Sequence, residues 1–108
     1  MDPWHPTETI TRLAPFVRGL IAAIVNGPAR TSSALRRSIC EGTPSDPKLA
    51  AYVEKVRRSS YRVAPSDIDA LRDSGFDDDA IFEITVAAAL GEALRRLRIG
   101  LRVLGKAE

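Results

Sequence analysis

Apolar residues recur at helical spacing along the first quarter of the chain. From Leu13 to Val25 their spacing alternates between three positions and one, which is the pattern of one face of an amphipathic α-helix. Pro15 is expected in or near the first turn of this helix, where a missing N–H costs little. The helix should end at Asn26-Gly27-Pro28, because this combination is typical of a turn.

The twelve residues before this helix have a different character. Pro3 and Pro6 lie among mixed polar residues, so an extended arm is expected over residues 1–12. Trp4 lies in this arm, where it is expected to dock on the protein's own core or on a neighbouring subunit. Residues 13–108 are expected to form a single helical domain.

Three short helices are predicted in the middle of the chain, each from a residue that favours a helix start. Ser32 or Ser33 is expected to cap the first, because its hydroxyl can accept a backbone N–H. Asp46 should cap the second, with Pro47 in its first turn, and Pro65 should open the third. No alternating β-branched run predicts a strand, so the chain is expected to be all-α.

The fifth predicted helix is the longest and has almost no polar side. Gly75 should end the helix before it in a left-handed conformation, and Asp77 should cap its start. It is expected to run to about Leu104. Glu83 and Glu92 are its only charged residues between positions 80 and 94. A helix that is apolar nearly all the way round must be buried on more than one side.

A leucine seam follows the second half of this long helix. Its residues are spaced four, three, four and three positions apart, which is a heptad pattern over two repeats. The seam predicts packing against the chain's own first helix, against a second subunit, or against both. The candidate oligomer interface consists of Leu90, Leu94, Leu97, Leu101 and Leu104, together with Trp4.

Composition and charge describe an ordinary globular chain of 108 residues. It is 44% hydrophobic and 28% charged, and its net charge is only +2, because 16 basic residues face 14 acidic ones. This balance argues against a nucleic-acid binder, whose charge is usually lopsided. A domain of this size buries only about two-thirds of its unfolded surface, so a partner subunit would stabilise it.

The single cysteine, Cys40, bears on both location and chemistry. One thiol cannot form an intramolecular disulfide, and neither a signal peptide nor a membrane span is visible, so a soluble cytoplasmic protein is expected. Arg36 and Arg37 are close in sequence and could lower the pKa of the thiol, which would make Cys40 a candidate catalytic nucleophile. The alternative is that Cys40 is a small buried hydrophobe.

No cofactor or metal site is expected. Asp77, Asp78 and Asp79 are consecutive carboxylates of a kind that hard cations bind, but helix capping and the helix dipole explain them without a metal. His5 is the only histidine and cannot hold zinc alone. Tyr52 and Tyr61 could line a pocket between helices or could be ordinary half-buried residues.

Residues 66–97, "SDIDALRDSGFDDDAIFEITVAAALGEALRRL", resemble the C-terminal half of the alkylhydroperoxidase-D-like, or carboxymuconolactone decarboxylase, superfamily. The likeness extends over about residues 48–104 and is mostly a packing pattern. It implies an all-α helical bundle and helix-mediated homo-oligomers. The matching residues are Leu71, Gly75, Phe76, Asp78, Ile81, Ala87–Ala89, Leu90, Arg96 and Leu97.

The chain departs from the superfamily where its redox chemistry resides. The peroxidase branch implies a Cys-x-x-Cys pair followed by a histidine, whereas Cys40 has no second cysteine and no histidine after it. The expected function is therefore a non-catalytic, homo-oligomeric binding or accessory protein, whose partner could be a protein or a small molecule. The alternatives are a diverged enzyme acting through Cys40 or an interhelical pocket and, less favoured by the charge pattern, a DNA-associated regulator.

Overall fold

The computed structural model describes residues 6–42 and 44–107, and every regular element in this part of the chain is a helix. This confirms the prediction of an all-α fold with five α-helices, the longest of which lies at the C-terminal end. A single 3₁₀ turn, η1, follows the third α-helix. The elements are α1 (Pro6–Asn26), α2 (Ser33–Glu41), α3 (Pro47–Ser59), η1 (Ser60–Arg62), α4 (Pro65–Asp73) and α5 (Asp78–Ala107).

The helix starts follow the capping residues of the sequence. The Ser32 hydroxyl accepts the N–H of the third residue after it, at 3.1 Å, and the Asp46 carboxylate accepts two N–H groups of the first turn of α3. Asp77 accepts the N–H of Ala80 at 2.8 Å. Gly75 has φ +99°, the left-handed conformation predicted for the end of α4. These local predictions are confirmed.

The start of α1 differs from the prediction. The helix begins at Pro6, so residues 6–12 are helical and do not belong to an extended arm. Proline suits a first helical position because it lacks a backbone N–H, and an N–H at that position would have no partner in the helix. Pro15 consequently lies well inside α1 instead of in its first turn. Trp4 lies outside the described residues.

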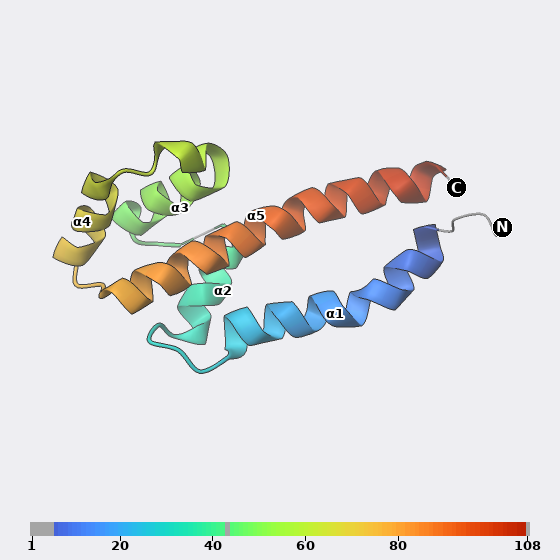
Figure 1. Cartoon of the computed structure of the whole chain (residues 1–108), viewed down its shortest axis with the longest axis horizontal. Helices are drawn as coiled ribbons and strands as arrows, with labels where there is room; N and C mark the ends of the chain where they lie inside the picture. The colour runs from blue at the N-terminus through green and yellow to red at the C-terminus, as the bar shows by residue number, and fades with distance from the viewer. Residues whose placement is uncertain (1–5, 43, 108) are drawn as a thin grey trace.

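The two long helices run side by side in opposite directions, and the short helices gather at one end of them (Figure 1). α5 contacts each of α1, α2, α3 and α4. The molecule is elongated, 57 × 29 × 23 Å, because α1 and the second half of α5 extend beyond the short helices.

The core has two parts, both centred on α5. The larger part lies between α5 and the short helices, where Ile39, Leu49, Leu71 and Ile84 are the largest fully buried side chains. The smaller part joins α5 to α1. It consists of Val25, Leu90 and Leu94, with Val17, Ile21, Ile24 and Cys40 packed against them.

One glycine permits the close packing of α2 against α5. A Cβ at Gly91 would overlap the carbonyl oxygen of Cys40 and a guanidinium nitrogen of Arg57. Gly91 is buried, the Cys40 oxygen belongs to the backbone of α2, and the Arg57 guanidinium is held by hydrogen bonds to that backbone. The position therefore requires the absence of a side chain.

The variant Gly91→Ala should lower the free energy of unfolding by about 1–3 kcal/mol, the usual cost of overpacking a core. Gly19→Ala is the matched control, because Gly19 is exposed inside α1 and a Cβ there meets nothing within 4 Å. The control should gain about 0.5–1 kcal/mol from helix propensity. Urea unfolding at one protein concentration measures both, and a Gly91→Ala protein as stable as the control would contradict the packing argument.

Candidate functional site

The polar groups inside the bundle form a framework that ties helix ends together, and it begins with two arginines. Arg36 of α2 is only 4% exposed and donates to the carbonyl oxygens of Ile24 at 2.7 Å and Gly27 at 2.8 Å. Both carbonyls lie at the C-terminal end of α1, where backbone acceptors lack helical partners and the helix dipole favours a cation. Arg36 therefore caps α1.

Arg57 of α3 does the same for α2. Its guanidinium donates to the carbonyl oxygens of Ile39 at 2.9 Å and Cys40 at 2.7 Å, in the last turn of α2. The side chain is 11% exposed, and it also lies 3.9 Å from the carboxylate of Glu92. The C-terminal ends of α1 and α2 are thus each capped by an arginine of the next helix in the chain.

The two glutamates of the apolar part of α5 complete the framework. Glu83 accepts the N–H of Arg30 at 2.9 Å, the N–H of Thr31 at 2.8 Å and the Thr31 hydroxyl at 2.7 Å. Burial raises the pKa of Glu83, but the hydrogen bonds from Thr31 and Arg30 and the charge of Arg36 together lower it by more. The net result is a pKa below its ordinary value, so Glu83 holds the α1–α2 loop as a carboxylate.

The pKa of Glu92 is lowered more strongly than that of Glu83. Hydrogen bonds from Arg95 and Arg96 lower its pKa to about 2, although burial acts to raise it. The N–O distances are 2.6 Å to Arg95 and 3.0 Å to Arg96, and the Glu92 side chain is 13% exposed. A carboxylate held in this way is a structural anion and a poor general base at neutral pH.

Cys40, the candidate catalytic residue, lies half-buried in the smaller core beside α1. Burial raises the pKa of its thiol, and the charges of Arg57 and Arg98 lower it by less. Arg36 and Arg37, expected to activate the thiol, point elsewhere, because Arg36 caps α1 and Arg37 donates to Asn26 at 3.0 Å. Cys40 therefore has the environment of a small apolar residue.

The two tyrosines considered as pocket residues lie in different environments. The Tyr52 hydroxyl lies 2.7 Å from that of Thr85, and Tyr52 is 6% exposed. Tyr61 lies on η1 and is 82% exposed, so it lines no pocket with Tyr52.

The aspartates at the start of α5 are likewise accounted for. Asp77 caps the helix, Asp78 pairs with Arg72 at 2.8 Å, and Asp79 lies 3.7 Å from Arg30. Among the described residues, no group of three potential ligands is placed to hold a metal ion.

The leucine seam divides into two parts. Leu90 and Leu94 are 7% and 8% exposed and pack against Val25 of α1, which assigns them to the chain's own core and not to a subunit interface. Leu97 is 42% exposed, and Leu101 and Leu104 are half-buried. Leu90 and Leu94 lie in the smaller core, where Val17, Ile21, Ile24 and Val25 of α1 pack with them.

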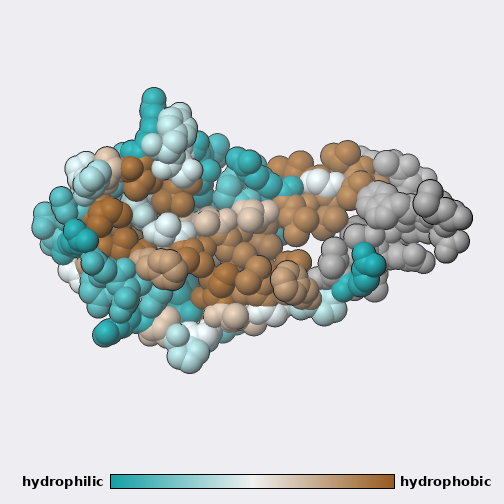
Figure 2. Space-filling model, in the orientation of Figure 1, coloured by the Kyte–Doolittle hydropathy of each residue, from teal (hydrophilic) through white to brown (hydrophobic). Residues whose placement is uncertain are grey.

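An apolar surface that shares only Leu97 with the predicted seam lies where α1 and α5 run together. Phe16 is 71% exposed, Phe82 is 69% exposed, and Leu20 is 42% exposed. Figure 2 shows apolar side chains gathered over these two helices. We call this surface the α1–α5 face, and it consists of Phe16, Leu20, Ala23, Phe82, Val86, Ala89, Ala93 and Leu97.

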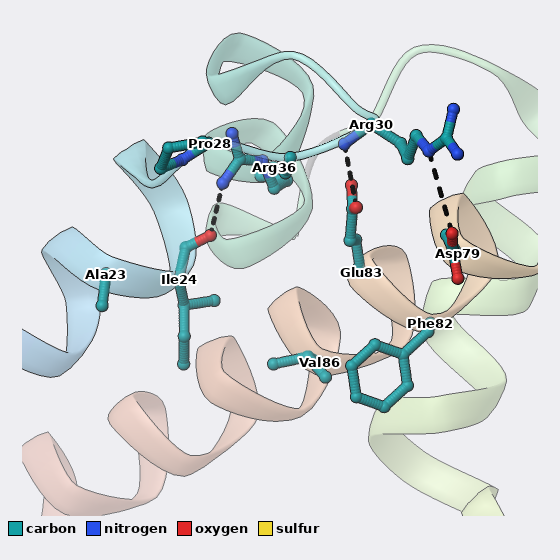
Figure 3. A pocket seen from close by; sticks show the side chains of 10 residues that line it. Ala23, Ile24, Pro28, Arg30, Arg36, Asp79, Phe82, Glu83 and Val86 are labelled. Carbon is teal, nitrogen blue, oxygen red and sulfur yellow. Dashed lines mark hydrogen bonds and ion pairs between the residues drawn. The ribbon is translucent and has the colours of Figure 1, made fainter.

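A groove of about 610 Å³ forms one end of the α1–α5 face (Figure 3). Its walls are apolar, from Ala23 and Ile24 of α1 to Phe82 and Val86 of α5, and Phe82 and Val86 lie on its α5 side. Charged groups line its upper edge in the figure. They are Arg30, Arg36, Asp79 and Glu83, and each of them has a partner: Arg36 caps α1, Glu83 accepts from the α1–α2 loop, and Arg30 pairs with Asp79.

Comparisons of this chain with protein-family models, with curated proteins and with solved structures found no match. In the part of the chain that the structure describes, no helix combines the length and apolar character needed to cross a membrane.

The low pKa of Glu92 predicts a specific dependence of stability on pH. A carboxylate with a folded pKa of about 2 and an ordinary value of 4.5 stabilises the fold above about pH 4.5 and loses this contribution as the pH falls towards 2. Glu92→Gln should cost about 1 kcal/mol at pH 7, a value reduced because Arg95 and Arg96 are exposed. The difference in unfolding free energy between this variant and the wild type should disappear at low pH.

Urea unfolding across this pH range measures the difference. Glu54→Gln serves as the control, because Glu54 forms an exposed pair with Arg58 and should contribute less than about 0.5 kcal/mol. A Glu92→Gln deficit that stays constant from pH 7 to the acid limit would contradict the assignment.

Proposed function

We propose that this chain is a non-catalytic, helical protein that self-associates and serves as a binding or accessory subunit. The observation that carries the proposal is the α1–α5 face, where two phenylalanines are more than two-thirds exposed. Monomeric proteins rarely expose large contiguous apolar patches, and such patches usually bind a partner. Burying a side chain such as Phe82 is worth about 1.5–3 kcal/mol, so covering this face would stabilise the chain.

The partners of the polar side chains support the non-catalytic half of the proposal. Catalysis of the redox or acyl-transfer type requires a nucleophile next to a base. The carboxylates of Glu83 and Glu92 are engaged in the capping framework, and the pKa of the Cys40 thiol is raised by burial. In the described residues, no base hydrogen-bonds to this thiol.

Kinship with the alkylhydroperoxidase-D-like superfamily is part of the same proposal and rests on the pattern of residues 66–97. In this view the chain keeps the helical packing of the superfamily but lacks its Cys-x-x-Cys pair. A cytoplasmic location, in keeping with a lone unpaired thiol, belongs to the proposal as well.

Self-association predicts a molecular mass of at least twice 11.7 kDa in solution. Light scattering across a concentration series measures this mass. Phe82→Glu should shift the protein to the monomer, because a carboxylate would have to lose its hydration in the interface. Tyr61→Glu is the matched control, because Tyr61 is 82% exposed but lies on η1, and it should leave the mass unchanged.

A wild-type protein that is monomeric at every concentration would overturn the proposal. Because Phe82 is 69% exposed, its replacement should leave the helical circular dichroism intact, which separates loss of association from loss of folding.

The alternative is a diverged enzyme that acts through Cys40, and one observation favours it. The charges of Arg57 and Arg98 act to lower the pKa of this thiol, although burial outweighs them. A raised pKa leaves little thiolate at neutral pH. We therefore expect peroxide consumption with an added dithiol to be the same for the wild type and Cys40→Ser. A rate that disappears in Cys40→Ser would establish the enzymatic alternative.

A further inference from the structure

The exposed side of α5 carries an apolar stripe that runs nearly the length of the helix. Its residues are spaced four, three, four, four, three and four positions apart, so they stay on one face of the helix. The stripe is about 33 Å long at 1.5 Å per residue. All its members are exposed or half-buried. The α5 stripe consists of Phe82, Val86, Ala89, Ala93, Leu97, Gly100 and Leu104.

The α5 stripe is symmetric about Ala93. Phe82 and Leu104 lie eleven residues on either side of it, Val86 and Gly100 lie seven, and Ala89 and Leu97 lie four. When two such helices pair antiparallel, each residue faces its mirror position on the partner. Valine then faces glycine, leucine faces alanine, and the two copies of Ala93 face each other.

This pairing has the steric properties of a well-packed helix interface. In the middle of the stripe large side chains meet small ones, so the two surfaces interdigitate there. At each end Phe82 meets Leu104, so the two largest side chains of the stripe pack against each other and not against a second copy of themselves. Small residues at the centre allow the helix axes to approach to about 8 Å, the short end of the usual range. A parallel pairing would instead place Phe82 on Phe82 and Gly100 on Gly100, which leaves crowding at one end and a void at the other.

The charges along α5 favour the same direction. The helix begins with Asp78 and Asp79, and its last third carries Arg95, Arg96, Arg98 and Arg102. Antiparallel pairing brings the acidic end of each copy towards the basic end of the other, whereas parallel pairing brings like charges together. The helix dipoles favour the antiparallel arrangement as well.

α1 provides a second wall for the partner helix. Ala23 of α1 lines the groove at the Phe82 end, which is open to solvent (Figure 3), and Phe16 and Leu20 are exposed further along the same helix. In the antiparallel pairing, the Gly100–Leu104 segment of the partner lies opposite Phe82 and Val86. Each copy thus fills the groove of the other, which gives a closed two-fold interface.

From the stripe, its symmetry and its charges, we infer that a second copy of this chain docks antiparallel on the α5 stripe, with a two-fold axis beside Ala93 and its Gly100–Leu104 segment in the groove. The inference rests on the proposed self-association and adds to it the surface, the direction and the register of pairing.

Disulfide trapping tests the register in the full chain. In a Cys40→Ser background, Ala93→Cys places two thiols next to each other across the axis, within the Cβ–Cβ distance of about 3.5–4.5 Å that a disulfide needs. Ala51→Cys on α3 and Val103→Cys on another side of α5 are exposed controls. Because a bound partner holds thiols at millimolar effective concentration, Ala93→Cys should cross-link at least about tenfold faster than either control.

Mixing Ala89→Cys with Leu97→Cys tests the direction. Antiparallel pairing predicts the mixed disulfide, identified by its intact mass, in excess over either self-linked product, whereas parallel pairing predicts the two self-linked products. If the wild type is dimeric by light scattering but Ala93→Cys links no faster than the controls, or the self-linked products dominate, this interface is overturned and the proposed function stands. A wild type that is monomeric throughout overturns both.

Discussion

Burial of the first half of α5 is the constraint on which the rest of the structure depends. Between Ala80 and Leu94 the helix carries only two charges, so most of its circumference has to leave water. α1, α2, α3 and α4 each contact it, and residues that are far apart in sequence meet on it. The short helices are individually too short to be stable in water, and they persist because α5 supplies the apolar surface that they cover.

The few charges inside the bundle position its helices. Arg36 and Arg57 bind the carbonyl ends of α1 and α2, and Glu83 reaches from α5 to the α1–α2 loop. Glu92 pairs with Arg95 and Arg96 of its own helix and lies 3.9 Å from Arg57. Each group satisfies backbone atoms or charges that would otherwise lack partners at helix ends. These structural roles account for the buried arginines and glutamates, the residues that could most easily be taken for catalytic groups. What remains unexplained by packing is the apolar α1–α5 face.

That face gives the molecule its asymmetry. The four surrounding helices cover α5 on one side as far as Leu94, and beyond it only α1 accompanies the helix. The exposed side is apolar over the same length, and small residues lie at its centre. A surface of this kind favours association between helices over binding of a charged ligand, because its partner must exclude water and have a complementary shape. This is why the proposed function concerns assembly.

The sequence by itself determined the local structure: the all-α class, the caps at Ser32, Asp46 and Asp77, and the left-handed Gly75. These features depend on hydrogen bonds between residues within a few positions of one another, so the residue types suffice to predict them. The sequence also indicated that α5 had to be buried. It placed the start of α1 too late, because Pro6 fits an extended arm as well as a first helical turn.

Only the tertiary structure decided which sides of α5 are covered and what the charged residues do. Because α5 is apolar nearly all round, its sequence does not distinguish the core side of Leu90 and Leu94 from the exposed side of Phe82 and Ala93. The partners of Glu83, Arg36 and Arg57 come from other helices or their loops, and the pKa of Cys40 depends on burial between α1 and α5. Such contacts arise from the docking of whole helices, and local patterning carries no information about where a distant helix will dock.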